Sequence, residues 1–439
     1  MNRYLLKGGM IVTPDSTKNL DLLVVGDFIE KIGHDLNVDG AELIDCRGKL
    51  ILPGVIDPHV HFRDPGFLEK EDWASGSLAA VQGGVTTVFD MPNTNPATTS
   101  REALALKLDA AKAKSLCNFG VFAGATPTNN DELLAMKEDV MGIKIYMGSS
   151  TGDLLVDRLE ALKQIFDLKM QIVVHAESER LINENMEKFR EVHDPAIHSV
   201  IRNNEVAAAA TQMAIELGEA KNVRLHIAHM STKEELLLVK NAKRRGYSNL
   251  SCEVCPHHLY FNTDDYLKFG NYLRVNPPIR SADDVAALWF DGIGLYGVDM
   301  VATDHAPHLP ETKEVDYWQA HSGMPGVQES LPLMLTAVSE GRLTINRLVE
   351  LMSFNPAKIF GVAKRGLVTE GNFADLAIID PLDEYVYTKD MVATKCGWSN
   401  YVGRKFVGKV VYTFVNGNLV FDRGSVNYGT HGSQIRPAF

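Results

Sequence analysis

The sequence predicts a (β/α)8 TIM barrel together with a small β-sandwich-like domain that both ends of the chain build. Eight short apolar or β-branched runs follow one another at spacings of about 20–40 residues, with helical patterns between them. Both termini consist instead of β-type runs broken by Gly, Asn and Asp. We therefore expect the barrel at 53–363 and the β domain at 1–52 and 364–439; a doubly wound open sheet is the competing topology.

Each predicted element has a local signal. The apolar periodicity predicts helices at 101–114, 154–166 and 232–245, among others. Near the carboxyl end, Asn416-Gly417 predicts a tight hairpin. The predicted barrel strands are 54–61, 86–90, 119–123, 142–146, 171–175, 224–229, 250–254 and 298–304.

Composition narrows the class of protein. The net charge of −12 argues against a nucleic-acid backbone as partner, since such binders carry basic patches. No apolar run approaches the roughly 20 residues that span a bilayer, and the amino end is charged where a signal peptide is apolar. We expect a cytoplasmic protein. The five cysteines are too few for a disulfide framework, and Cys252 and Cys255 fit two core residues better than a zinc or redox pair.

Histidines gather at the ends of the predicted strands. Asp57, His59 and His61 alternate along the first strand, so we expect all three to point into the barrel mouth. Two imidazoles on one face can share a metal ion. His175 closes the fifth strand and His229 the sixth. These four histidines predict a metal site at the carboxyl end of the barrel.

Three further residues complete this pattern. His226 lies three positions before His229, which places it on the opposite, helix-facing side of a regular strand. Asp304 closes the eighth strand, with His305 aimed away. Lys144 stands inside a buried strand, where an isolated ammonium is costly. Either its amine is neutral and carries a carbamate that bridges two metals, or its stem reaches to the rim.

Six motifs, in order along essentially the whole chain, resemble those of dihydroorotases in the amidohydrolase superfamily. They are Asp57-Pro-His-Val-His-Phe-Arg-Asp-Pro-Gly66, Glu69-Lys-Glu-Asp72, Met91-Pro-Asn-Thr94, Cys252-Glu-Val-Cys-Pro-His-His258, Thr303-Asp-His-Ala-Pro-His308 and Gly323-Met-Pro-Gly326.

The resemblance implies a centre of two Zn²⁺ ions per subunit. It implies that His59 and His61 hold one ion and that His175 and His229 hold the other. N6-carboxylated Lys144 would bridge the two ions. Some family members use an aspartate bridge, for which Asp153 is the local candidate. Asp304 would bind the first ion and act as catalytic acid/base.

The implied reaction is the reversible hydrolysis of (S)-dihydroorotate to N-carbamoyl-L-aspartate in de novo UMP biosynthesis, with a metal-bridged hydroxide as nucleophile. Arg63 would meet the substrate carboxylate with a bidentate fork. The same family pattern implies that Asn93, Asn276, His308, Ser322 and Gly323 also contact the substrate.

Two other functions differ from this one in features of the sequence. Allantoinase, or another cyclic-amide hydrolase of the superfamily, is the alternative enzyme, but such enzymes typically lack the arginine at 63. A non-catalytic structural partner would have lost metal ligands that this chain retains. Related enzymes are commonly homodimers, and association with aspartate transcarbamoylase is possible in this family. The segment 148–152, rich in Gly and Ser, has the composition of a loop that closes over the site.

Overall fold

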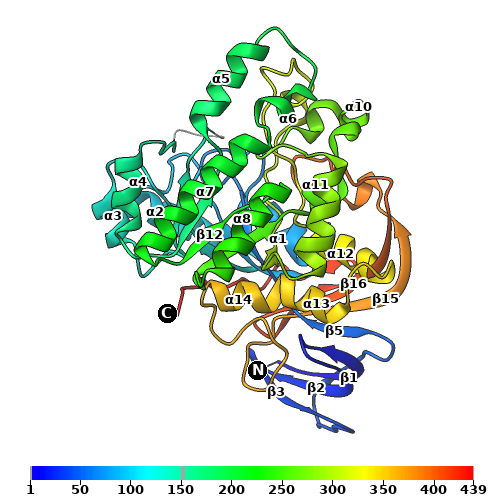
Figure 1. Ribbon diagram of the computed structural model, residues 1–439. Coiled ribbons are helices and arrows are strands. Elements are labelled where there is room, and N and C mark those ends of the chain that lie inside the picture. The colour runs from blue at the N-terminus through cyan, green and yellow to red at the C-terminus, as the bar shows by residue number, and fades with distance from the viewer. Residues whose placement is uncertain (1, 150–153, 439) are drawn as a thin grey trace.

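The computed structural model describes residues 2–149 and 154–438, and its centre is a closed barrel of eight parallel strands (Figure 1). Parallel pairing runs from β6 to β8 and from β9 to β14, and β8 and β9 are two parts of one strand that bends at Phe122. The barrel closes where Val60 bridges His305 and the His61 N–H donates to the His305 carbonyl over 2.8 Å. This confirms the predicted barrel rather than an open sheet. The strands are β6 Val55–Val60, β7 Val85–Asp90, β8 Asn118–Val121, β9 Ala123–Gly124, β10 Ile143–Tyr146, β11 Ile172–His175, β12 Leu225–Ile227, β13 Leu250–Val254 and β14 Met300–Val301.

The barrel strands are buried on both faces, as apolar parallel strands require. Outward-facing side chains such as Ile143 and Ile145 pack against the helices in the largest core cluster. A smaller cluster, which includes Phe89, Phe122 and Phe360, packs edge to face in the barrel interior. This apolar floor leaves the carboxyl ends of the strands as the place for polar residues.

Helices surround the barrel (Figure 1), and their starts follow sequence signals. Thr232 caps α8 through a reciprocal capping box with Glu235. The helix predicted at 154–166 begins only at Leu159, because Leu155 pairs with Tyr146 beside β10. The helices are α1 Trp73–Gln82, α2 Arg101–Lys114, α3 Asn130–Ala135, α4 Leu159–Phe166, α5 Glu179–Phe189, α6 Ile197–Ile201, α7 Asn204–Lys221, α8 Lys233–Arg244, α9 Pro256–Tyr260, α10 Tyr266–Phe269, α11 Ala282–Ala287, α12 Ser330–Ser339, α13 Ile345–Val349 and α14 Asn355–Ile359.

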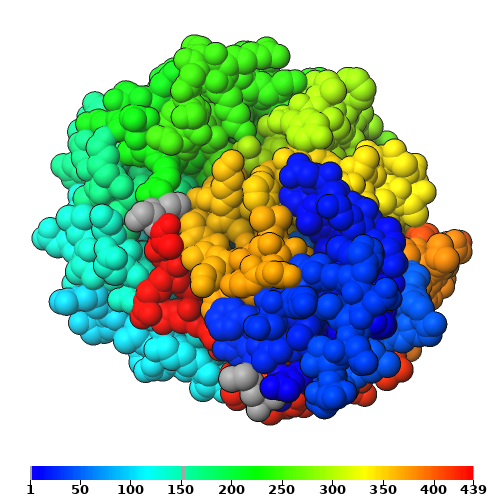
Figure 2. Space-filling model, turned by 90° about the horizontal axis from the view of Figure 1, so that it is seen from below, coloured from blue at the N-terminus to red at the C-terminus, as the bar shows by residue number. Residues whose placement is uncertain are grey.

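Both ends of the chain form one separate nine-stranded sheet, as predicted. The amino-terminal strand β5 pairs antiparallel with the carboxyl-terminal strand β15, and β1 pairs with β4 along its first half and with β5 along its second. Asn416 and Gly417 form the predicted hairpin, both with positive φ. Seen from below, the blue amino-terminal segment lies beside the yellow-orange segment that includes α13 and α14 (Figure 2). The strands are β1 Arg3–Val12, β2 Thr17–Val25, β3 Phe28–Gly33, β4 Glu42–Asp45, β5 Leu50–Pro53, β15 Leu376–Val386, β16 Lys405–Val415, β17 Asn418–Asp422 and β18 Ser425–Val426.

The domain boundaries at 1–52, 53–363 and 364–439 stay a proposal.

None of the helices in the described part of the chain combines the length and the apolar character that a membrane span needs.

Candidate active site

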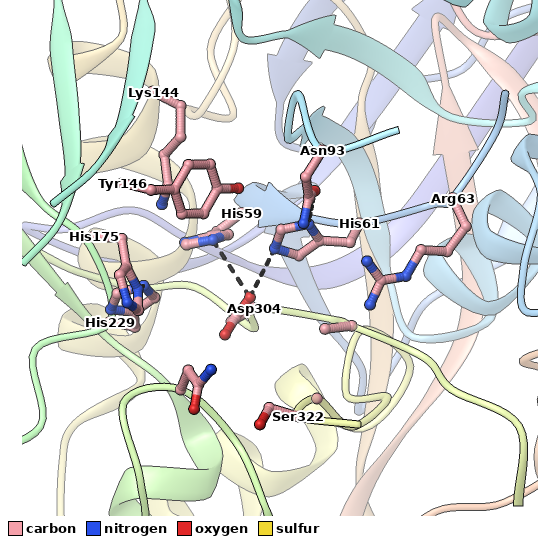
Figure 3. A pocket seen from close by; sticks show the side chains of 13 residues that line it. His59, His61, Arg63, Asn93, Lys144, Tyr146, His175, His229, Asp304 and Ser322 are labelled. Atoms are coloured by element: carbon pink, nitrogen blue, oxygen red, sulfur yellow. Dashed lines mark hydrogen bonds and ion pairs between the residues drawn. The ribbon is translucent and has the colours of Figure 1, made fainter. Parts of the chain in front are cut away.

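One polar cavity lies at the carboxyl end of the barrel strands (Figure 3). It brings together side chains from β6, β10, β11 and the segments that follow β7, β12, β13 and β14. Every site residue predicted from the sequence lines it except His308. Its lining consists of His59, His61, Arg63, Asn93, Lys144, Tyr146, His175, His229, Asn276, Asp304, Ala306, Ser322 and Gly323.

His59 and His61 both turn Nε2 toward Asp304, at 3.4 and 3.0 Å from Oδ1 (Figure 3). Their other ring nitrogens form hydrogen bonds with neighbouring side chains. His59 Nδ1 donates to Glu253 over 2.5 Å and His61 Nδ1 donates to Asn93 Oδ1 over 2.6 Å. Hydrogen bonds of this kind fix the tautomer that leaves Nε2 free as a metal ligand.

Asp57 does not share this face, so the prediction that it points into the barrel mouth is wrong. A register shift between Asp57 and Val60 interrupts the alternation of β6. The Asp57 carboxylate instead accepts from the backbone N–H and the hydroxyl of Thr303, which ties β6 to the segment after β14. Burial, despite these hydrogen bonds, raises the pKa of Asp57 to about 7.

His175 and His229 lie side by side at one wall of the cavity (Figure 3), with Nδ1 of the first 2.9 Å from Nε2 of the second. Burial lowers the pKa of both rings, so that both are neutral and each can offer a lone pair. Glu177 Oε2 lies 3.0 Å from the other ring nitrogen of His175. Two ring nitrogens this close together, from adjacent strand regions, form a candidate binding site for a cation.

His226 is not on the helix-facing side, which corrects the sequence prediction. Its Nε2 donates to Glu253 over 3.0 Å, and its ring packs on Phe360 of the barrel floor. β12 ends at Ile227 and His229 has a φ of 38°, so the regular alternation stops between the two histidines. Both of them therefore reach the interior.

Lys144 and Asp304 complete the cluster. Among the described residues, the Lys144 amine has no hydrogen-bond partner although it is fully buried. Burial lowers the pKa of Lys144 to about 8. Burial alone would raise the pKa of Asp304, but the adjacent His59 and His61 outweigh it and hold this pKa below its ordinary value. The site thus pairs an ionised carboxylate with an amine that loses its proton easily.

The donor set fits a metal centre. Three of its members, His59, His61 and Asp304, bring ligand atoms within 4.8 Å of one another. His175 and His229 form a second pair of ligand nitrogens. Neutral imidazoles and a carboxylate are groups that bind divalent transition metals.

Arg63 forms the other side of the cavity. Its side chain is 2% exposed, and its guanidinium donates to the Pro307 carbonyl over 3.3 Å and to His308 Nε2 over 3.1 Å. In the part of the chain that the structure describes, no carboxylate forms an ion pair with it. His308 lies behind Arg63, and its Nε2 is also 3.0 Å from the Ser322 carbonyl oxygen. This buried cation is open to an anion in the cavity.

The remaining predicted contacts lie on the facing loops. His198 Nε2 donates to Asn276 Oδ1 over 2.9 Å, which orients that amide. The Gly323 N–H donates to the Arg274 carbonyl, and the buried Lys313 amine donates to the Gly323 carbonyl over 2.9 Å. Gly323 has a φ of +140°, and a Cβ there would meet the Ala306 carbonyl at 2.5 Å. Only glycine fits at this wall of the cavity.

Strained backbone coincides with the cavity. Arg63, His229 and Asp304 all have positive φ, at 65°, 38° and 48°. Such conformations cost about 1–3 kcal/mol each and persist where the surroundings hold them, typically at functional sites. Arg63 carries the buried positive charge, His229 is a candidate metal ligand, and Asp304 carries the carboxylate.

Sequence reasoning missed Tyr146 and Glu253. Tyr146 lines the cavity two positions after Lys144, so strand alternation was the signal that could have found it. Glu253 was visible only as part of a motif. Asp153 and most of the segment 148–152 lie outside the described residues. Cys252 and Cys255 are both free and buried.

Several known proteins are similar to this chain over nearly its full length. Residues 50–420 match the family model described as "Amidohydrolase family". A dihydroorotase of Methanosarcina acetivorans is 37% identical over 435 residues, covering 96% of this chain and 92% of that protein. An allantoinase of Rubrobacter xylanophilus is 36% identical over 448 residues, covering 99% and 97%. The solved L-hydantoinase (dihydropyrimidinase) of Arthrobacter aurescens superposes with a TM-score of 0.94 at 31% identity, covering 99% and 100%. The chain belongs to the amidohydrolase family.

Proposed function

We propose that this hydrolase is a zinc-dependent dihydroorotase, which interconverts (S)-dihydroorotate and N-carbamoyl-L-aspartate in de novo UMP biosynthesis. The observation that carries the proposal is the buried Arg63 guanidinium without a carboxylate partner among the described residues. A buried charge is costly unless it is paired. The carboxylate of dihydroorotate would supply that pair, and several relatives are named dihydroorotase.

Two zinc ions per subunit would be held by the cavity ligands. His59, His61 and Asp304 would bind one ion, His175 and His229 the other, and carboxylated Lys144 would bridge them. When bound, the ions supply Lewis-acid polarisation of the ring amide carbonyl and an activated water.

The protein residues then have distinct tasks. Arg63 holds the substrate carboxylate and thereby places the ring amide over the ligand cluster. Asn93, Asn276, His308, Ser322 and Gly323 would complete the substrate contacts, with His308 acting through Arg63. Asp304 takes the proton of the attacking water and delivers it to the ring nitrogen as the C–N bond breaks. Ring closure of carbamoyl-aspartate is the reverse of these steps.

Replacing Arg63 by methionine should raise the KM for dihydroorotate at least about 30-fold, since losing one partner of a buried charge pair costs 2 kcal/mol or more. Hydantoin, which has no carboxylate, is the matched control substrate, and its hydrolysis should not lose efficiency. Steady-state kinetics on both rings measure the difference. Equal losses on the two substrates would contradict carboxylate recognition by Arg63.

Allantoinase is the second candidate, because the allantoinase relative is as similar in sequence as the dihydroorotases. Allantoin has no carboxylate to pair with Arg63, which is why we rank it second. A non-catalytic structural role ranks lower still, since the full ligand set lines one cavity. We further propose a cytoplasmic homodimer, and association with aspartate transcarbamoylase would fit the pathway.

A further inference from the structure

A buried polar chain lies behind the candidate metal ligands and outside the cavity lining. It consists of Glu253 on β13, His226 on β12 and Ser251 on β13. Glu253 Oε2 accepts from His226 Nε2 over 3.0 Å, and His226 Nδ1 lies 2.8 Å from the Ser251 hydroxyl. With Nε2 as the donor to Glu253, Nδ1 of His226 is placed to accept a hydrogen bond from the Ser251 hydroxyl. The chain thus has one consistent direction of donation, which ends at the carboxylate.

The other oxygen of Glu253 contacts two residues that we propose as metal ligands. Oε1 accepts from His59 Nδ1 over 2.5 Å and from the backbone N–H of His229 over 3.0 Å. The first contact leaves His59 Nε2 turned toward Asp304. The second holds the backbone of His229 at a φ of 38°, which a non-glycine residue rarely adopts. One carboxylate therefore reaches a ligand of each proposed metal ion.

We propose that Glu253 is a positioning residue that orients His59 and His229 for metal binding, and that His226 holds Glu253 in place. The inference rests on the proposed metal ligands but not on the identity of the substrate. Glu253 is 1% exposed, and both of its oxygens are engaged by these three histidines. Because Glu253 does not line the cavity, it would affect metal binding through the histidines whose orientation it fixes.

Zn²⁺ affinity measured without substrate tests this role. Glu253→Gln should bind Zn²⁺ about 10–100-fold more weakly than the native protein in competition with a chromogenic chelator, the usual cost of losing such a partner. The visible absorption of the Co²⁺-substituted protein should change with it, because the geometry around the ion changes. His226→Phe should weaken Zn²⁺ binding in the same direction. His226→Gln, which retains an N–H donor, should restore most of the affinity.

Asp375→Asn is the matched control. Asp375 is also a buried, hydrogen-bonded carboxylate, but its partners are Asn118, Asn416 and Arg365. Its replacement should lower the melting temperature and leave Zn²⁺ affinity unchanged. If Glu253→Gln does not fold, the His226→Phe and His226→Gln pair decides the question.

Native Zn²⁺ affinity in both Glu253→Gln and His226→Phe would overturn the positioning role. So would equal weakening in Asp375→Asn, because it would show a general effect of removing a buried acid. A protein that opens allantoin instead of dihydroorotate would refute the proposed function and still show the Glu253 effect. A native protein that binds no Zn²⁺ would overturn the ligand set and this role together.

Discussion

Replacing Asp304 by asparagine is expected to lower kcat for dihydroorotate at least about 1,000-fold, because the proton-transfer group of the proposed mechanism is lost. The carboxamide has nearly the same shape, but it cannot take a proton from the attacking water. The low pKa of Asp304, which His59 and His61 maintain against burial, keeps the native group ionised and ready to accept. Rapid-quench or steady-state assays of ring opening, with metal content measured in parallel, provide the test.

Asp299→Asn is the control for this change. Asp299 lies just before β14, at the opposite end of the strand from Asp304, where it binds Lys243 and the Cys252 N–H. Its replacement removes a carboxylate from the same strand region without touching the cavity. Full activity in Asp304→Asn with normal metal content would refute the acid/base role.

Replacing Lys144 by alanine is the second change with a large expected effect. Without the proposed carbamate, the two ions lose their bridge, and we expect metal content to fall and kcat to drop by about 1,000-fold or more. The buried amine has no partner among the described residues and its pKa is lowered to about 8, so its neutral form is accessible for reaction with carbon dioxide. Mass spectrometry under native conditions should detect the added carbon dioxide on the native protein.

Chemical rescue distinguishes a bridging role from a folding role for Lys144. A short carboxylic acid such as propionate should restore part of the activity of Lys144→Ala, because it fits the space that the side chain leaves. Lys144→Arg is the control, since it fills that space and should not respond. No rescue in either variant, together with an unmodified native lysine, would contradict the carbamate bridge.

The barrel was predictable because its signal is local and repeated. Each strand is a short apolar run, buried on both faces, and the residues that end these runs meet at one rim. Position at the end of a predicted strand was enough to place His175 and His229 in the cavity lining. Their roles as metal ligands remain proposals.

The departures occur where the backbone leaves regular geometry. The register shift in β6 turns Asp57 away from His59 and His61, and the positive φ of His229 lets it face inward as well as His226. Neither feature has a signature in the residue pattern. Glu253 was missed for a related reason. Its proposed positioning role depends on contacts with His59 and His229, which belong to two other strand regions, and the Glu253 motif does not reveal these contacts.

The most direct test of the account is ring opening by the purified, zinc-loaded protein, with dihydroorotate, allantoin and hydantoin assayed side by side. We predict that dihydroorotate is opened with by far the highest kcat/KM, because only its carboxylate pairs with Arg63. Activity restricted to allantoin or hydantoin would contradict the proposed substrate, and silence on all three rings with metal bound would contradict the proposed catalysis.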